Sequence, residues 1–184
     1  LAWHLTGRWA TSVESADTLG LHDLRRRDWS PELLALAGLE AAQLPETVPA
    51  GEPIGTLLPD VARDLGVPPA ALVAGIGDGQ AAGLALGATA PGVAYLNLGT
   101  SMVMGTSSDA YVTDRAYRTL AGVRGTYVLE TVLNAAAYLA GWARDLVGLS
   151  VEEAEAAAAA VPPGAEGLLV LPYWNAVQTP YWDP

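Results

Sequence analysis

A single carboxylate stands in a glycine-rich bend of this sequence. The stretch "GIGDGQAAG" covers residues 75–83 and places Asp78 among glycines and other small residues. Glycines in such a bend let a backbone approach a ligand closely, and phosphate held by backbone N–H groups is the commonest ligand of this kind. A carboxylate in the same place repels phosphate. Asp78 therefore either caps the helix that follows it or serves as a base beside a phosphate.

A second group of polar residues follows in "VAYLNLGTSMVMGTS", residues 93–107. Two apolar runs flank Gly99, Thr100 and Ser101, which predicts a β-hairpin whose tight turn displays two hydroxyls and several N–H groups. Phosphoryl transfer needs such donors around the phosphates, together with a carboxylate that takes the proton of the attacking alcohol. The turn can supply the donors and Asp78 can supply the base.

Two familiar catalytic loops are excluded by single residues. A P-loop requires a lysine that reaches the β- and γ-phosphates, and the chain contains no lysine. A nucleophile elbow requires G-x-S-x-G, but in "GTSMV" Val103 replaces the second glycine. Neither a P-loop NTPase nor an α/β-hydrolase is therefore predicted.

A dinucleotide-binding turn is an alternative that stays open. Gly77, Gly79 and Ala82 satisfy G-x-G-x-x-A between a predicted strand and a predicted helix. Asp78 lies inside that turn, where it opposes pyrophosphate, and Asn97 stands where an acidic residue should hold the ribose. An NAD-binding oxidoreductase is thus the weaker interpretation of the same bend.

The composition narrows the classes of protein. The chain has 184 residues with 51% hydrophobic content, enough for one ordinary domain or parts of two. Its net charge of −11 makes nucleic acid and anionic membranes poor partners. Cysteine is absent, and His4 and His22 have no metal-binding spacing. No apolar stretch reaches the ~18 residues of a membrane helix, so a cytoplasmic protein is expected by default.

Capping signals and periodicity predict the elements that position these residues. Helices are predicted over residues 31–37, 57–65, 78–88 and 134–147, with a further helix that opens at the capping box of Ser150 and Glu153. Strands are predicted over 71–77, which should be buried, over 93–107 as the hairpin, and over 125–130 and 167–173. Residues 44–59 are predicted to be an extended connector, and Arg25, Arg26 and Arg27 a solvated surface loop. The fold class is α/β, with one unit ending near residue 89 and a second one beginning.

With these motifs the sequence resembles the FGGY family of carbohydrate kinases, which includes xylulose kinases and glycerol kinases. "GIGDGQAAGLALGA" is similar to the family's segment with the catalytic aspartate, and "YLNLGTSMVM" to its second phosphate loop. "DTLGLHDLRRRDWSPELLALAGL" and "LLVLPYWNAVQTPYWDP" are similar to its flanking signatures. The resemblance covers nearly the whole chain. It implies an actin-like pair of ribonuclease-H-like domains that close on ATP and a sugar.

The resemblance also implies a domain division and roles for particular residues. Residues 1–89 would be the C-terminal part of the first domain and residues 90–184 the N-terminal part of the second. Asp78 would be the general base and would bind the substrate together with Gly79 and Gln80. The ATP phosphates would lie at Gly99, Thr100 and Ser101, and the nucleotide would lie next to Ala136 and Ala137.

The partners that it implies are small molecules. They are ATP with Mg²⁺, which comes with the nucleotide and has no protein site of its own, and a sugar or polyol, with a pentulose such as xylulose favoured. A homodimer of the full-length protein stays open. The family's amino-terminal phosphate loop and its adenine site lie outside this sequence, so we expect a fragment that is inactive alone.

The sequence departs from the family at positions that bear on the substrate. Gly79 stands where the family commonly has glutamine directly after the catalytic aspartate. The helix after "YVLE" usually carries a glycine near the nucleotide, and here the matching residue is Ala137 or Ala136. In "NAVQTP", Val177 replaces a charged residue. A non-catalytic actin-like sensor of nucleotide and sugar therefore remains a rival, beside the oxidoreductase.

Overall fold

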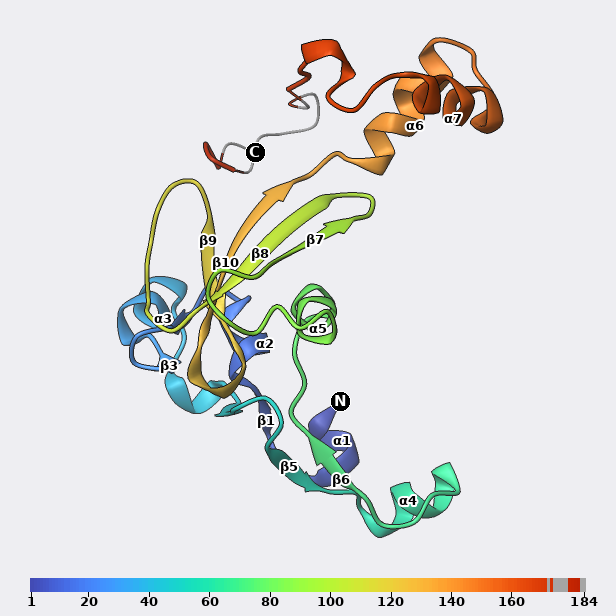
Figure 1. Cartoon of the computed structure of the whole chain (residues 1–184). Helices are drawn as coiled ribbons and strands as arrows, with labels where there is room; N and C mark the ends of the chain where they lie inside the picture. Colours follow the sequence, from blue (N-terminus) through green and yellow to red (C-terminus); the bar gives the residue numbers. More distant parts are fainter. Residues whose placement is uncertain (172, 174–178, 183–184) are drawn as a thin grey trace. The chain divides into compact units, whose positions relative to one another are not determined.

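The chain divides into two compact units. The computed structural model describes residues 1–171, 173 and 179–182 (Figure 1). Unit 1 contains residues 1–95, 105–113 and 118–130. Unit 2 contains the described residues of 96–104, 114–117 and 131–184.

Unit 1 holds most of the short helices and strands. Its helices are α1 (Ala2–Thr6), α2 (Val13–Asp17), α3 (Pro31–Ala37), α4 (Pro59–Leu65) and α5 (Asp78–Ala85), with 3₁₀ turns at Ala41–Gln43 and Val123–Gly125. Its strands are β1 (Ala10–Ser12), β2 (His22–Asp23), β3 (Asp28–Trp29), β4 (Glu46–Val48), β5 (Pro53–Thr56), β6 (Ala71–Val73) and β9 (Arg118–Ala121). Strands β1 and β4 pair in parallel, whereas β2 pairs with β3, and β5 with β6, in antiparallel fashion.

The largest sheet follows α5 along the chain. Strands β7 (Ala94–Leu98), β8 (Met102–Ser108) and β10 (Tyr127–Leu133) join β9 in the order β7-β8-β10-β9. Strands β9 and β10 are antiparallel, and their register places Arg118 opposite Glu130. Strands β7, β8 and β10 each have residues in both units, and unit 2 contains α6 (Ala137–Leu146), α7 (Val151–Ala160) and a 3₁₀ turn at Ala165–Gly167.

The buried apolar residues of unit 1 form small clusters rather than one large core. One cluster contains Ala10, Val48, Ile54 and Ala74. A second joins Val13 and Leu24 to Ala121, and a third joins Ala16 to Trp29 and Leu34. Several of these residues are alanines, which have small side chains. Close approach of the backbones therefore contributes much of the packing in this unit.

Helix boundaries follow the capping residues. In α3 the Ser30 hydroxyl accepts the N–H of Leu33 at 3.3 Å, Pro31 occupies the first turn, and Gly38 ends the helix at φ 68°. In α7 the Ser150 hydroxyl accepts the N–H of Glu153 at 3.1 Å, and the Glu153 carboxylate accepts the N–H of Ser150 at 2.8 Å. These two helix starts confirm the sequence-based predictions.

Three predictions of secondary structure are wrong. Residues 44–59 are not only a connector, because β4 and β5 lie within them and find pairing partners. Strand β6 exists, but it is not buried, since Val73 is 49% exposed. Residues 168–171 form no strand in the structure; their run of apolar side chains has the composition of a strand but no neighbouring strand to pair with among the described residues.

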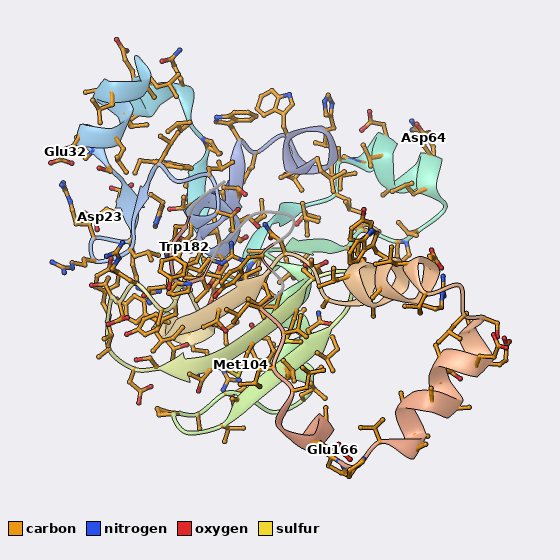
Figure 2. All side chains as sticks on the ribbon, turned by 90° about the horizontal axis from the view of Figure 1, so that it is seen from above. Asp23, Glu32, Asp64, Met104, Glu166 and Trp182 are labelled. Atoms are coloured by element: carbon orange, nitrogen blue, oxygen red, sulfur yellow. The ribbon has the colours of Figure 1, made fainter. Side chains whose placement is uncertain are left out.

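The arginine cluster is only partly a solvated loop. The Arg27 guanidinium donates to the carbonyl oxygens of Gly125 and Thr126, and Arg25 lies 4.8 Å from the ring centroid of Tyr111. These contacts hold the loop against the residues just before β10 and against Tyr111, which follows β8. Asp23 and Glu32, which flank the cluster, lie on the outside in Figure 2.

Candidate active site

Asp78 is the first residue of α5, directly after the N-cap residue Gly77. Its Oδ1 accepts the backbone N–H of Gly79 at 2.8 Å, and the residue is exposed to solvent. A negative charge in the first turn interacts favourably with the helix dipole. The carboxylate thus stabilises the helix start and is also open to an approaching hydroxyl, so the geometry is compatible with both interpretations of this residue.

Gln80 and Gly79 occupy different surroundings although they are neighbours. A Cβ at Gly77 would lie 2.3 Å from Oε1 of Gln80, so the Gln80 side chain folds back over the N-cap and requires a glycine there. A Cβ at Gly79 would lie 4.0 Å from Oε2 of Glu130. Gly79 therefore faces a buried carboxylate of β10.

Glu130 belongs to a polar network that no sequence motif indicated. The residue is 2% exposed, and its Oε1 pairs with Nε of Arg118 at 2.8 Å and with Nη2 of the same guanidinium. The Tyr95 hydroxyl donates to Oε2 at 3.1 Å. Burial and the adjacent charge of Glu130 raise the pKa of the Tyr95 hydroxyl, which therefore stays protonated as a donor.

The opposite charges of Arg118 and Glu130 were the available signal for this network, but only Glu130 lay in a predicted strand. Twelve positions separate the two residues, and only the register of β9 and β10 brings them together.

A cavity of about 500 Å³ lies in unit 1 beside this network. Gln80, Gly83 and Tyr95 line part of it, and Thr106 and Arg124 line another part. Asp78 and Gly79 are not among its lining residues. Of the three predicted substrate-binding residues the cavity therefore reaches Gln80 but not Gly79 or the candidate base Asp78.

The predicted phosphate loop forms the turn between β7 and β8. The N–H of Gly99 donates to the carbonyl oxygen of Ser101 at 3.0 Å. The N–H groups of Ala136 and Ala137 donate to the carbonyl oxygens of Thr100 and Gly99 at 3.0 and 3.1 Å. The structure thus brings together these five residues, which the sequence analysis had placed near the nucleotide.

The hydroxyls of this turn are available to a ligand. Thr100 is exposed, and neither its hydroxyl nor that of Ser101 makes a hydrogen bond within the described part of the chain. Hydroxyl groups that make no other hydrogen bond can donate to phosphate oxygens. Within the same part of the chain, no group of three His, Asp or Glu side chains could hold a metal ion.

The candidate residues therefore form two groups. Asp78, Gly79 and Gln80 lie in unit 1, whereas Gly99, Thr100, Ser101, Ala136 and Ala137 lie in unit 2. Each group is locally compact.

Comparison with other sequences identifies relatives of this chain. Residues 1–85 match the profile of the FGGY family of carbohydrate kinases, N-terminal domain. The whole chain is 34% identical to a xylulose kinase of Klebsiella pneumoniae, of which it covers 39%. It is also 34% identical, over its whole length, to a glycerol kinase of Aromatoleum aromaticum, of which it covers 38%. The chain thus spans about two fifths of the length of these relatives.

Solved structures show the same relationship. A ligand-bound xylulose kinase from Lactobacillus acidophilus superposes with a TM-score of 0.88 at 25% identity, covering 98% of this chain and 38% of the other. A xylulose kinase from Rhodospirillum rubrum superposes with a TM-score of 0.85 at 28% identity and the same coverage.

The fold is therefore the mixed α/β, actin-like fold of sugar kinases, as the sequence predicted. The chain is thus similar to the FGGY family of carbohydrate kinases, whose N-terminal domain profile matches residues 1–85, and to xylulose and glycerol kinases over its whole length. Neither an NAD-binding oxidoreductase nor a non-catalytic sensor is supported by these comparisons. Among the described residues, no helix has the length and apolar character needed to cross a membrane.

Proposed function

We propose that the protein containing this chain transfers the γ-phosphate of ATP to a hydroxyl of a sugar or polyol, most readily a pentulose such as xylulose. The observation that carries the proposal is the exposed Asp78 carboxylate at the start of α5, in a chain similar to the FGGY family. The names of its relatives, xylulose kinase and glycerol kinase, support the class of acceptor.

In the proposed reaction Asp78 is the general base. It takes the proton of the substrate hydroxyl while that oxygen attacks the γ-phosphorus. The bond from the γ-phosphorus to the bridging oxygen breaks, and ADP leaves. Gly79 and Gln80 are proposed to contact the substrate, since Gln80 lines the cavity of unit 1 and Gly79 directly follows Asp78.

The turn of Gly99, Thr100 and Ser101 is proposed to receive the phosphates of ATP, because its two hydroxyls are free and the start of α6 is tied to its carbonyl groups. Ala136 and Ala137 would then lie next to the nucleotide. Mg²⁺, bound with ATP, would neutralise phosphate charge. We also propose the boundary of the two domains near residue 89, which the end of the family match at residue 85 supports.

A direct assay tests the proposed function. ADP release by the full-length protein is expected to require ATP, Mg²⁺ and a sugar, with the highest kcat/KM for a pentulose in a panel of pentuloses, hexuloses and polyols. Binding of ATP and sugar without ADP release would indicate a sensor instead. A preference for NAD over ATP, measured by calorimetry, would indicate an oxidoreductase.

Thr100→Val tests the phosphate loop. The substitution keeps the shape of the side chain and removes its hydroxyl. Loss of a hydrogen bond to a charged group costs roughly 1.5–3 kcal/mol, so kcat/KM for ATP is expected to fall roughly 10- to 100-fold. Thr100→Ser, which keeps the hydroxyl, is the matched control and should stay near the parent. Unchanged ATP kinetics in a folded Thr100→Val protein would make the turn a purely structural one.

A further inference from the structure

One face of α5 is made of glycine and rests on the Tyr95–Glu130 network. Gly79 and Gly83 are four residues apart and so lie on the same side of the helix. A Cβ at Gly83 would lie 2.6 Å from two ring carbons of Tyr95, and one at Gly79 would lie 4.0 Å from Oε2 of Glu130. The backbone of α5 therefore packs directly on Tyr95 and lies close to Glu130, with no side chain between them.

The Tyr95 ring is confined on its other side as well. A Cβ at Gly105 of β8 would lie 2.5 Å from Cζ and from the hydroxyl oxygen of Tyr95. The ring is thus enclosed by two glycines, and its hydroxyl is directed to Glu130 at 3.1 Å. Such a ring cannot move without moving α5 or β8, because protein interiors have little free volume.

Glu130 is fixed from the opposite direction. Arg118, its partner across the β9–β10 pair, binds Oε1 through two nitrogens, which leaves Oε2 for Tyr95. Both oxygens of the carboxylate are thus held, Oε1 by Arg118 and Oε2 by Tyr95. The network therefore runs from Arg118 through Glu130 and Tyr95 to Gly83 of α5.

We propose that Tyr95 and Glu130 are positioning residues for Asp78. This inference rests on the proposed function, in which Asp78 is the base. Within the described residues the Asp78 carboxylate accepts one hydrogen bond, from the N–H of Gly79. The direction of this carboxylate is therefore set by the first turn of α5. Helix α5, which carries that turn, is held against the Tyr95 ring at Gly83, and Tyr95 in turn is bound by Glu130.

The kinetic test uses Tyr95→Phe in the full-length protein. Phenylalanine keeps the ring between the glycines and removes only the hydroxyl. Misplacing a catalytic group by about 1 Å costs roughly 100-fold, so kcat is expected to fall roughly 10- to 100-fold, while KM for the sugar changes by less than about 3-fold. Glu130→Gln should act in the same direction. Glu46→Gln, which alters an exposed Arg–Glu pair of the same unit, is the matched control and should leave kcat unchanged.

A double variant shows whether the effect passes through Asp78. If it does, Tyr95→Phe should slow Asp78→Asn by less than about 2-fold, because the group that it positions is already gone. An equal loss in both backgrounds would mean that the network supports the fold in general, and it would overturn the proposal.

Amide hydrogen exchange gives a readout that does not need activity. The amides of Ala81 and Ala82 should exchange faster in Tyr95→Phe than in the parent, whereas those of α4 should not change. If the parent protein shows no sugar-dependent ADP release, the proposed function is wrong. The exchange result then decides by itself whether Tyr95 positions the helix start that carries Asp78. Unchanged exchange at residues 78–83, or unchanged kcat in an active parent, would overturn the positioning role. Should Glu130→Gln fail to fold, Tyr95→Phe alone decides.

Discussion

Asp78→Asn in the full-length protein is expected to lower kcat by roughly 10² to 10⁴, the usual effect of removing a general base. Asparagine has nearly the same shape and can accept the same N–H bond from Gly79 through its amide oxygen, but it cannot take a proton from the substrate. The melting temperature and the KM for the sugar should therefore change little. Steady-state kinetics and a thermal melt measure these quantities.

Asp60→Asn is the matched control for this variant. Asp60 is also an exposed aspartate in the first turn of a helix of unit 1, namely α4. Its replacement removes the same charge from a similar position and should leave kcat at the parent value. A folded Asp78→Asn protein that turns over within a few-fold of the parent would show that Asp78 only stabilises the helix start and that another group is the base.

Arg118→Met is expected to destabilise the full-length protein by roughly 3 kcal/mol, because it leaves a buried carboxylate without its cation. The side chain of Glu130 is only 3% exposed, whereas that of Arg118 is 47% exposed, so the charge that stays behind is the one shielded from water. Tyr95 still donates one hydrogen bond to it, which places the expected loss at the low end for a broken buried pair. Urea unfolding measures the change.

Two further variants make this result specific. Glu130→Gln in the Arg118→Met background removes the unpaired charge and should recover most of the lost stability. Arg8→Met breaks a pair with Glu46 in which both side chains are exposed, and it should cost about 1 kcal/mol or less. If Arg118→Met costs no more than Arg8→Met, water reaches Glu130, and the network of Tyr95, Glu130 and Arg118 is not rigid.

Local signals were enough to predict helices α3 to α7 and the β7–β8 hairpin, but not the short elements of residues 1–30 or strand β9. The helix starts at Ser30 and Ser150 and the helix end at Gly38 were predicted correctly, because a cap is formed by residues within one helical turn of each other. The turn at Gly99, Thr100 and Ser101 was predicted for the same reason. The strand predicted at 167–173 is absent from residues 168–171, because strand formation needs a partner strand that local composition cannot supply.

The sequence by itself was enough to indicate the similarity to FGGY kinases and to propose the candidate residues. Asp78 and the Gly99–Ser101 turn each lie in one short motif, so residue types and spacing were sufficient to find them. Whether Asp78 acts as a base stays a prediction for the experiment above.

Only the tertiary structure decided which residues pack against the helix that carries Asp78. Nothing in the spacing of Tyr95, Arg118 and Glu130 relates them to the first turn of α5, since the three residues meet through the register of β9 with β10 and through the approach of α5 to the Tyr95 ring. In the sequence, Tyr95 is one residue of an apolar strand pattern, and Gly83 is one of several small residues in a predicted helix. The contact itself depends on long-range pairing and on the exclusion of any side chain at Gly83, and such properties belong to the folded chain rather than to a local motif.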